Sequence, residues 1–127
     1  MTMKKKELIV TSALPYANGP LHFGHLLEHI QTDIWVRSQR ILGNHCIYLC
    51  ASDAHGTPIM MKAEEENIVP EKLVDKYMKA HKKTLEAFQV SHDCYYQTHS
   101  EENKKYSELI YNTALKNGYI KKQNIKI

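Results

Sequence analysis

The sequence has few cysteines and no closely spaced cysteine pair. Its three cysteines are an odd number and none belongs to a Cys-x-x-Cys motif, which argues against a secreted disulfide scaffold. Cys46 and Cys50 fall in one apolar run. If that run is a strand, their side chains stand about 13 Å apart, too far for one zinc ion to bridge. We therefore expect buried thiols in a reducing cytoplasm and no metal site in this chain.

Membrane and targeting signals are also lacking. No stretch approaches the ~20 apolar residues that span a bilayer, and the apolar run that follows the N-terminal lysines is short and interrupted. Internal repeats, low-complexity tracts and flexible linkers are missing as well. The chain has 127 residues, 43% of them hydrophobic and 24% charged, which is typical of one soluble globular domain. We expect no membrane partner and a cytoplasmic location.

The apolar residues of the first half follow strand and helix spacings in turn. A β-branched run at Leu8–Val10 leads into a turn-rich loop at Pro15–Pro20, and apolar residues then recur at helical spacing over Gly24–Leu42. The stop signal Gly43-Asn44 precedes a second buried strand at Cys46–Cys50. Strand, helix and strand in this order predict an α/β fold with a parallel sheet and a right-handed crossover helix.

The second half of the chain has a mainly helical pattern. Three helices are predicted from their caps and prolines: one from Thr57 and Pro58 to about Asn67, one from Pro70, and one capped by Ser100 and closed by Asn117-Gly118. Short strands are expected to begin at Tyr119–Ile120 and at Ile125–Ile127. Of the remaining histidines, His45, His81, His92 and His99 are expected at the surface or in caps.

The loop between the first strand and the first helix carries the most informative residues. In an open α/β sheet, ligands bind outside the carboxyl ends of the strands, and a helix start there favours phosphate. Gly24 would let a base or phosphate approach the backbone, and His22 and His25 could donate hydrogen bonds to phosphate oxygens. A His-x-Gly-His sequence also occurs by chance, so the strand before it and the helix after it carry the functional interpretation.

A second cluster, Ala51–Pro58, follows the second predicted strand and should reach the same edge of the sheet. Asp53 could hold a cation, a ribose hydroxyl or an α-amino group. Alternatively, Asp53 and Thr57 merely cap the next helix. Spacing alone does not decide between these interpretations.

Together these segments resemble a known enzyme family. Thr11–His25, with its Ala-Leu-Pro-Tyr-Ala-Asn-Gly stretch before His-Phe-Gly-His, resembles the first signature of the class I aminoacyl-tRNA synthetases, and the methionine-specific enzymes in particular. Ala54–Pro58 after Asp53 and His99–Asn103 are similar to segments of the same enzymes. The resemblance extends across essentially the whole chain. It implies the first half of a Rossmann-like nucleotide-binding fold, truncated.

The resemblance also implies an activity and a set of site residues. Such an enzyme is an AMP-forming methionine–tRNA ligase, which activates methionine with ATP and Mg²⁺ and passes the methionyl group to tRNA(Met). The residues implied as catalytic are His22 and His25. Those implied to bind ATP are Pro15, Tyr16, Asn18, Gly19, His22, Gly24 and His25. Those implied to bind methionine are Ala13, Leu14, Tyr16 and Asp53, the carboxylate taking the α-amino group.

The sequence departs from the family pattern in two ways. Phe23 stands where the motif usually has a smaller aliphatic residue, and we expect its side chain to point toward the core. The Lys-Met-Ser-Lys-Ser loop that grips ATP is absent. We therefore expect residues 1–127 to be the N-terminal part of the catalytic domain. The zinc-binding insertion, where Zn²⁺ would be held, is absent from this chain, as are the second half of the catalytic domain and the anticodon-binding domain.

Two rival hypotheses belong to other functional classes. A small nucleotidyltransferase also uses a His-x-Gly-His turn, but its first strand typically runs into Gly-Thr-Phe-Asp-Pro rather than the Ala-Leu-Pro-Tyr found here. A fragment that binds ligands without catalysis is the other alternative. We expect the isolated chain to be inactive.

Overall fold

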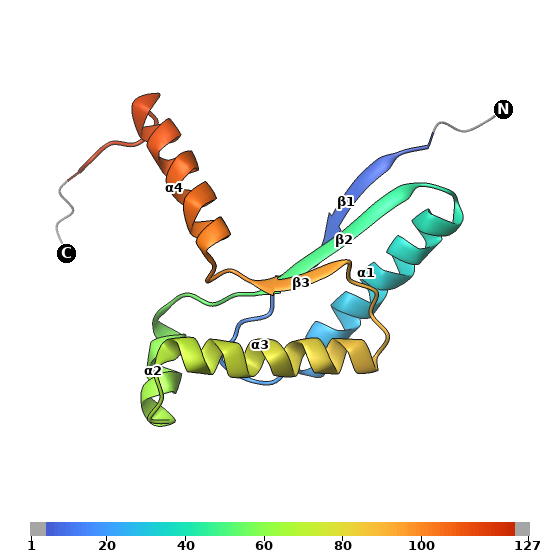
Figure 1. Cartoon of the computed structure of the whole chain (residues 1–127), viewed down its shortest axis with the longest axis horizontal. Helices are drawn as coiled ribbons and strands as arrows, with labels where there is room; N and C mark the ends of the chain where they lie inside the picture. Colours follow the sequence, from blue (N-terminus) through green and yellow to red (C-terminus); the bar gives the residue numbers. More distant parts are fainter. Residues whose placement is uncertain (1–4, 124–127) are drawn as a thin grey trace.

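The computed structural model describes residues 5–123, and these form a three-stranded parallel sheet with four helices (Figure 1). The strands are β1 (Glu7–Thr11), β2 (His45–Ser52) and β3 (Cys94–Gln97), in the order β1-β2-β3. Leu8 pairs with Cys46 and Leu49 with Cys94. The parallel sheet predicted from the sequence is confirmed, but β3 was not predicted.

One face of the sheet is covered by α1 (Phe23–Ile41) and α3 (Pro70–Ala87). Tyr48 of β2, fully buried, meets Val36 of α1 and Leu85 of α3 in the main core cluster. Because neighbouring side chains on a strand point to opposite faces, Leu49 points away from this core and is 37% exposed. Ile9 of β1 is 76% exposed.

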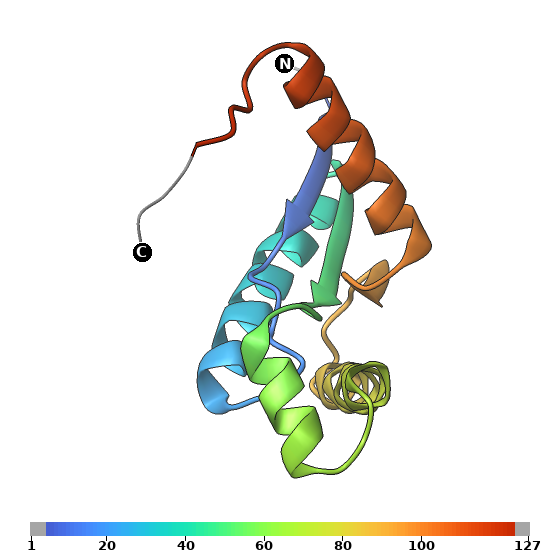
Figure 2. The ribbon, with the colours of Figure 1, turned by 90° about the vertical axis from the view of Figure 1, so that its left-hand side faces the viewer.

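A second apolar cluster lies at the carboxyl end of the sheet. Here α2 (Thr57–Glu65) contributes Ile59 and Ala63, which pack against Leu73 of α3. Ala17 and Ala54, from the loops that follow β1 and β2, complete the cluster. Figure 2 shows α2 and α3 close together beside these loops. The loops that follow β1 and β2 are thus packed against an apolar cluster.

Two carboxylates hold the segment that leads into β3. Asp93 accepts hydrogen bonds from the backbone N–H of Tyr48 and from Arg40 of α1, both at 2.6 Å. Asp33 accepts the backbone N–H of Ser91 at 2.7 Å. Burial alone would raise the pKa of Asp33, but the hydrogen bonds from Ser91 and Arg37 outweigh it and lower that pKa.

The helix α4 (Glu101–Lys116) extends away from the sheet (Figure 1). Ser100 caps it as predicted, because its hydroxyl accepts the Asn103 N–H at 3.1 Å. No residue of α4 is buried, although it carries Tyr106, Leu109 and Ile110.

Two predictions, one about the packing of Phe23 and one about a strand after α4, are wrong in this structure. Phe23 does not point toward the core and is 79% exposed, since it occupies the first turn of α1 on the side away from the sheet. Tyr119 and Ile120 form no strand, because the residues after α4 lie beside no described strand. The strand expected at Ile125–Ile127 lies outside the described residues. Among residues 5–123, no helix is long and apolar enough to cross a bilayer.

Candidate functional site

The candidate site is built where β1 and β2 end. After β1 the chain runs through an irregular loop into α1, and Asp53 directly follows β2. These two segments are hydrogen-bonded to each other: Ala17 N–H donates to the Asp53 carbonyl and Asp53 N–H donates to the Pro15 carbonyl, both at 2.8 Å. This pairing extends the sheet by one step beyond its strands. It places both predicted clusters at the same carboxyl edge.

His22 and His25 form the N-terminal cap of α1. The Gly24 N–H donates to His22 Nδ1 at 3.1 Å, and the His22 N–H donates to His25 Nδ1 at 3.3 Å. The two rings are stacked, with centroids 3.7 Å apart. A ring nitrogen that accepts a hydrogen bond carries no proton, so each neutral imidazole carries its proton on Nε2. The cap therefore leaves two Nε2–H donors free for a ligand.

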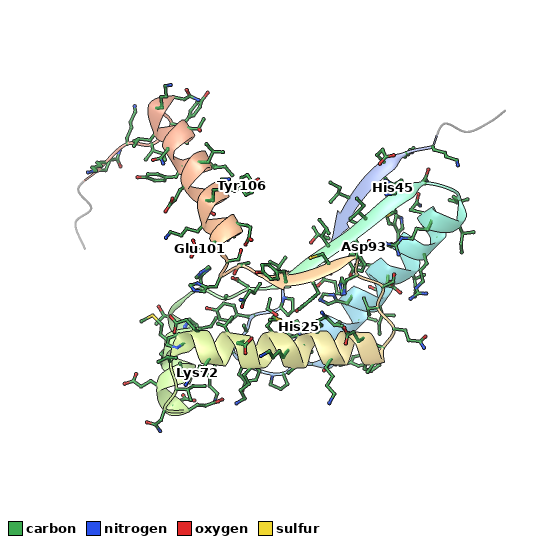
Figure 3. The ribbon with its side chains drawn as sticks, in the orientation of Figure 1. His25, His45, Lys72, Asp93, Glu101 and Tyr106 are labelled. Atoms are coloured by element: carbon green, nitrogen blue, oxygen red, sulfur yellow. The ribbon has the colours of Figure 1, made fainter. Side chains whose placement is uncertain are left out.

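The protonation state of His25 suits this arrangement. Burial, followed by the neighbouring His22, lowers the pKa of His25 from the ordinary value of 6.5. His25, labelled in Figure 3, also lies close enough to His81 of α3 for that ring to lower its pKa. At neutral pH the His25 ring is uncharged and is a hydrogen-bond donor rather than a cation.

Gly24 has a local structural role in the same cap. A Cβ atom built at Gly24 would lie 3.0 Å from Cε1 and 3.1 Å from Nδ1 of the His22 ring. Such contacts are tighter than ordinary van der Waals separations, so a side chain here would displace the ring from the Gly24 N–H. This glycine keeps His22 on the helix end.

The residues predicted to bind methionine line the first part of the loop. The Ala13 N–H donates to Glu28 of α1 at 2.6 Å, and Leu14 is 40% exposed. Tyr16 is half-buried, and its hydroxyl donates to the His55 carbonyl at 2.6 Å. Tyr16 thus spans from the first loop to the loop after β2.

The remaining predicted ATP-binding residues follow in the same loop. Pro15 is fully buried, whereas Asn18 and Gly19 are half-buried. Asn18 N–H donates to the Tyr16 carbonyl at 2.9 Å, which forms a tight turn. The Gly19 carbonyl accepts a hydrogen bond from His81 at 2.7 Å.

Asp53 presents a half-buried carboxylate at this edge. Its side chain has one long hydrogen bond, from the Thr98 hydroxyl at 3.4 Å. No lysine or arginine among residues 5–123 forms an ion pair with it. A carboxylate in this state is available to a cationic ligand group.

Sequence reasoning missed the contribution from the end of β3. Thr98 follows β3, and its hydroxyl accepts the Ala54 N–H at 2.8 Å. His55 and His99 meet at 3.2 Å between ring nitrogens. Together with residues of the N-terminal half of α4 they line a cavity of about 450 Å³, and Thr98 of this lining also contacts Asp53. The signal that could have found it is the His-Ser-Glu-Glu segment, which directly follows a third strand end.

One buried cluster among the described residues has the composition of a metal site. The ligand atoms of His29, Cys50 and His92 lie within 4.8 Å of one another. However, His29 Nδ1 is already 3.1 Å from the Ser12 hydroxyl and 3.3 Å from His92 Nε2. The Cys50 sulfur is in turn 3.7 Å from the Ser12 hydroxyl, and burial raises the pKa of this thiol. We interpret this hydrogen-bonded cluster as part of the core.

Two histidines lie elsewhere than predicted. His81 is not at the surface: it is 1% exposed, because α3 turns it toward the end of β2. His92 is largely covered between Tyr48 and Tyr95, and burial and His29 lower its pKa to about 4. His45 and His99 are exposed as predicted.

This fold and this strand-edge site define a class of enzyme. A sequence profile of the family described as class I tRNA synthetases (M) matches residues 8–127, and the chain therefore belongs to this family. The nucleotidyltransferase alternative is thereby set aside.

Within the family, the chain is similar to methionine–tRNA ligases. It is 54% identical over 121 residues to the methionine–tRNA ligases of two strains of Leptospira biflexa serovar Patoc, a match that covers 95% of this chain. The chain spans about 18% of the length of these curated relatives.

Solved structures agree on the fold. The methionyl-tRNA synthetase of Mycobacterium tuberculosis, in complex with methionyl-adenylate, superposes with a TM-score of 0.86 at 23% identity, over 91% of this chain and 22% of that one. The LeuRS of Agrobacterium radiobacter K84, in a ternary complex with tRNA and LeuAMS, gives a TM-score of 0.83 at 19% identity, over 92% of this chain and 15% of that one.

Proposed function

We propose that this chain supplies the first part of an enzyme that activates methionine with ATP. The reaction joins the methionine carboxylate to the α-phosphate, giving methionyl-adenylate and pyrophosphate. The methionyl group then passes to the terminal adenosine of tRNA(Met). The proposal rests mainly on His22 and His25. They cap α1 and keep their Nε2–H donors free, and they lie at the sheet edge that also carries Asp53.

The His22 and His25 rings act on the ATP phosphates. Each offers an Nε2–H, held in place by a hydrogen bond at its Nδ1. As the carboxylate attacks, negative charge grows on the oxygens around the α-phosphate, and donors fixed beforehand stabilise that charge without reorganising. Mg²⁺ enters with ATP as part of the substrate. Pro15, Asn18 and Gly19 shape the loop along which the nucleotide lies.

The methionine substrate is held on the other side of the same edge. Asp53 takes the α-ammonium group, because its half-buried carboxylate lacks a lysine or arginine partner among the described residues. Ala13, Leu14 and Tyr16 provide apolar and aromatic surface for the thioether side chain. The Tyr16 hydroxyl is already used by His55, so the ring face rather than the hydroxyl meets the ligand.

The domain assignment is part of the proposal. Residues 1–127 correspond to the N-terminal part of a class I catalytic domain, and the similarity to relatives about five times longer supports this. If the whole enzyme carries zinc, we assign its site to another segment of that enzyme. Contacts to tRNA(Met) are assigned mostly to segments beyond this chain.

The test is methionine-dependent exchange of pyrophosphate into ATP by a full-length enzyme that carries this chain. We expect exchange with methionine and none with leucine or phosphopantetheine. Exchange that does not depend on methionine would refute the proposal. The isolated chain should show no turnover, and calorimetry with methionine or ATP then distinguishes a binding-competent fragment from an inert one.

A further inference from the structure

His81 is a buried polar group that the proposed chemistry does not use. Its ring lies in α3 and is 1% exposed. Its Nε2 is 2.7 Å from the Gly19 carbonyl oxygen, and its Nδ1 is 3.0 Å from the Ser52 hydroxyl. The Ser52 hydroxyl is in turn 2.9 Å from the Tyr95 hydroxyl. Both ring nitrogens therefore have partners.

The direction of each hydrogen bond follows from the carbonyl at one end. A carbonyl only accepts, so His81 Nε2 carries the proton and donates to Gly19. In the neutral ring Nδ1 then accepts, so the Ser52 hydroxyl donates to it. Ser52 has one proton, and the Tyr95 hydroxyl must therefore donate to Ser52. Burial lowers the pKa of His81, which favours the neutral ring that this order requires.

The hydrogen bonds that run from Tyr95 through Ser52 and His81 to Gly19 form a relay. This relay connects the two halves of the proposed site. Gly19 lies in the loop just before His22 and His25, and Ser52 directly precedes Asp53. The start of the loop is held by the backbone pairing of Ala17 with Asp53. Closer to α1, the Gly19 carbonyl is tied to His81, and Leu21 rests on the main core cluster.

His81 holds this loop through a backbone group, the Gly19 carbonyl. A Cβ atom built at Gly19 would meet no atom within 4 Å, so no neighbour confines this residue from its side-chain direction. The hydrogen bond from His81 to the Gly19 carbonyl therefore fixes the position of the loop relative to α3. Losing it leaves a half-buried carbonyl without its partner and loosens the approach to the α1 cap.

We infer that His81 is a positioning residue, which holds the loop bearing His22 and His25 against the strand end bearing Asp53 through the relay from Tyr95 and Ser52 to Gly19. This inference rests on the proposed function, since it concerns the same site. His81 itself touches neither substrate. It acts by keeping the phosphate donors at a fixed distance from the methionine carboxylate, and small displacements of such groups cost rate steeply.

Two substitutions separate positioning from stability. His81→Gln keeps an amide N–H near the position of Nε2, so the bond to Gly19 is retained. His81→Leu fills similar space without a donor. Leu85→Ala, one turn further along α3 and 1% exposed, is the matched control, because it weakens the core without touching the relay.

The first readout is structural and uses the chain itself. Nitrogen-15 NMR of the imidazole distinguishes a proton on Nε2 from one on Nδ1. We expect the Nε2–H form at His81, and a downfield-shifted ring proton that disappears in His81→Leu. A proton on Nδ1 would contradict the relay, whatever the enzyme does.

The second readout is kinetic and uses a full-length enzyme that carries this chain. In methionine-dependent pyrophosphate exchange, His81→Leu should lower kcat about 10- to 100-fold and change the methionine KM less than about threefold. His81→Gln should recover to within about threefold of the parent enzyme. Leu85→Ala should lower Tm at least as much as His81→Leu while keeping kcat within about threefold.

The outcomes separate the two hypotheses. If the parent enzyme shows no methionine-dependent exchange, the proposed function fails, and the NMR result alone judges the relay. If the parent is active but His81→Leu keeps its kcat, the positioning role is refuted and the function stands. Equal losses in His81→Leu and Leu85→Ala at equal Tm would also refute positioning, because stability would then explain both.

Discussion

Replacing Gly56 with alanine should destabilise the chain by about 2–4 kcal/mol, and part of that effect should depend on Tyr16. Gly56 has φ 122° and ψ 162°, a conformation open almost only to glycine. A Cβ atom there would overlap the Tyr16 hydroxyl oxygen. The hydroxyl would have to move away and release the His55 carbonyl, to which it donates at 2.6 Å.

The two contributions are separated by a second substitution. The backbone conformation alone costs an alanine about 1–3 kcal/mol. Loss of the hydrogen bond from Tyr16 adds about 1 kcal/mol. Tyr16→Phe removes the oxygen, so in that background Gly56→Ala meets only the backbone cost. The double variant should therefore be about 1 kcal/mol more stable than the sum of the two single effects predicts.

The measurement is urea unfolding of the parent, the two single variants and the double variant, monitored by circular dichroism. Ser107→Ala, on exposed α4, is a control whose free energy of unfolding should stay within about 0.5 kcal/mol of the parent value. Strict additivity of Gly56→Ala and Tyr16→Phe would refute the reasoning, because it would mean that the tyrosine hydroxyl does not cover Gly56.

Three further predictions concern the site and its surroundings. His22→Asn keeps an N-cap acceptor, but its shorter side chain places no N–H at the position of Nε2, so kcat for pyrophosphate exchange should fall about 10²–10³-fold in the full-length enzyme with little change in Tm. Asp53→Asn should raise the methionine KM about 10- to 100-fold and leave the ATP KM unchanged, as titrations of each substrate would establish. The pKa of His92 is lowered to about 4, so the unfolded chain binds a proton more readily below pH 6.5. Stability should be highest above pH 6.5 and decline by ~3 kcal/mol between pH 6.5 and 4, and urea midpoints of His92→Asn should decline less.

Helices and the central strand were predictable because their patterns are local. Apolar spacing located α1 within one residue at each end, and Pro70 marked the start of α3. The cap at Ser100 was also predictable, since its hydroxyl needs only its own helix. Local chemistry placed both site segments at strand ends, which is why they lie on one edge of the sheet.

The elements that were missed depend on distant contacts. β3 has only four residues, Cys94–Gln97, and is held beside β2 partly by Asp93, whose carboxylate binds Tyr48 and Arg40. No local period reveals such a strand. Without β3, Thr98 was not recognised at the third strand end, and its contacts with Ala54 and Asp53 remained unseen.

The roles of single histidines were equally hidden. His81 directly precedes the polar run Lys82-Lys83-Thr84 of α3, and only the end of β2 shows that it is buried against Ser52. The hydrogen bonds that Nδ1 of His22 and Nδ1 of His25 accept, and hence the proton on each Nε2, come from a helix cap whose geometry the residue types do not specify.

The central claim is that the His22 and His25 rings and the Asp53 carboxylate bind one substrate pair in one pocket. A crystal structure of the full-length enzyme with methionine and a non-hydrolysable ATP analogue tests it most directly. The account predicts both Nε2 atoms within hydrogen-bond distance of phosphate oxygens and the Asp53 carboxylate on the methionine ammonium group. A methionine bound away from Asp53, or phosphates beyond reach of both rings, would contradict it.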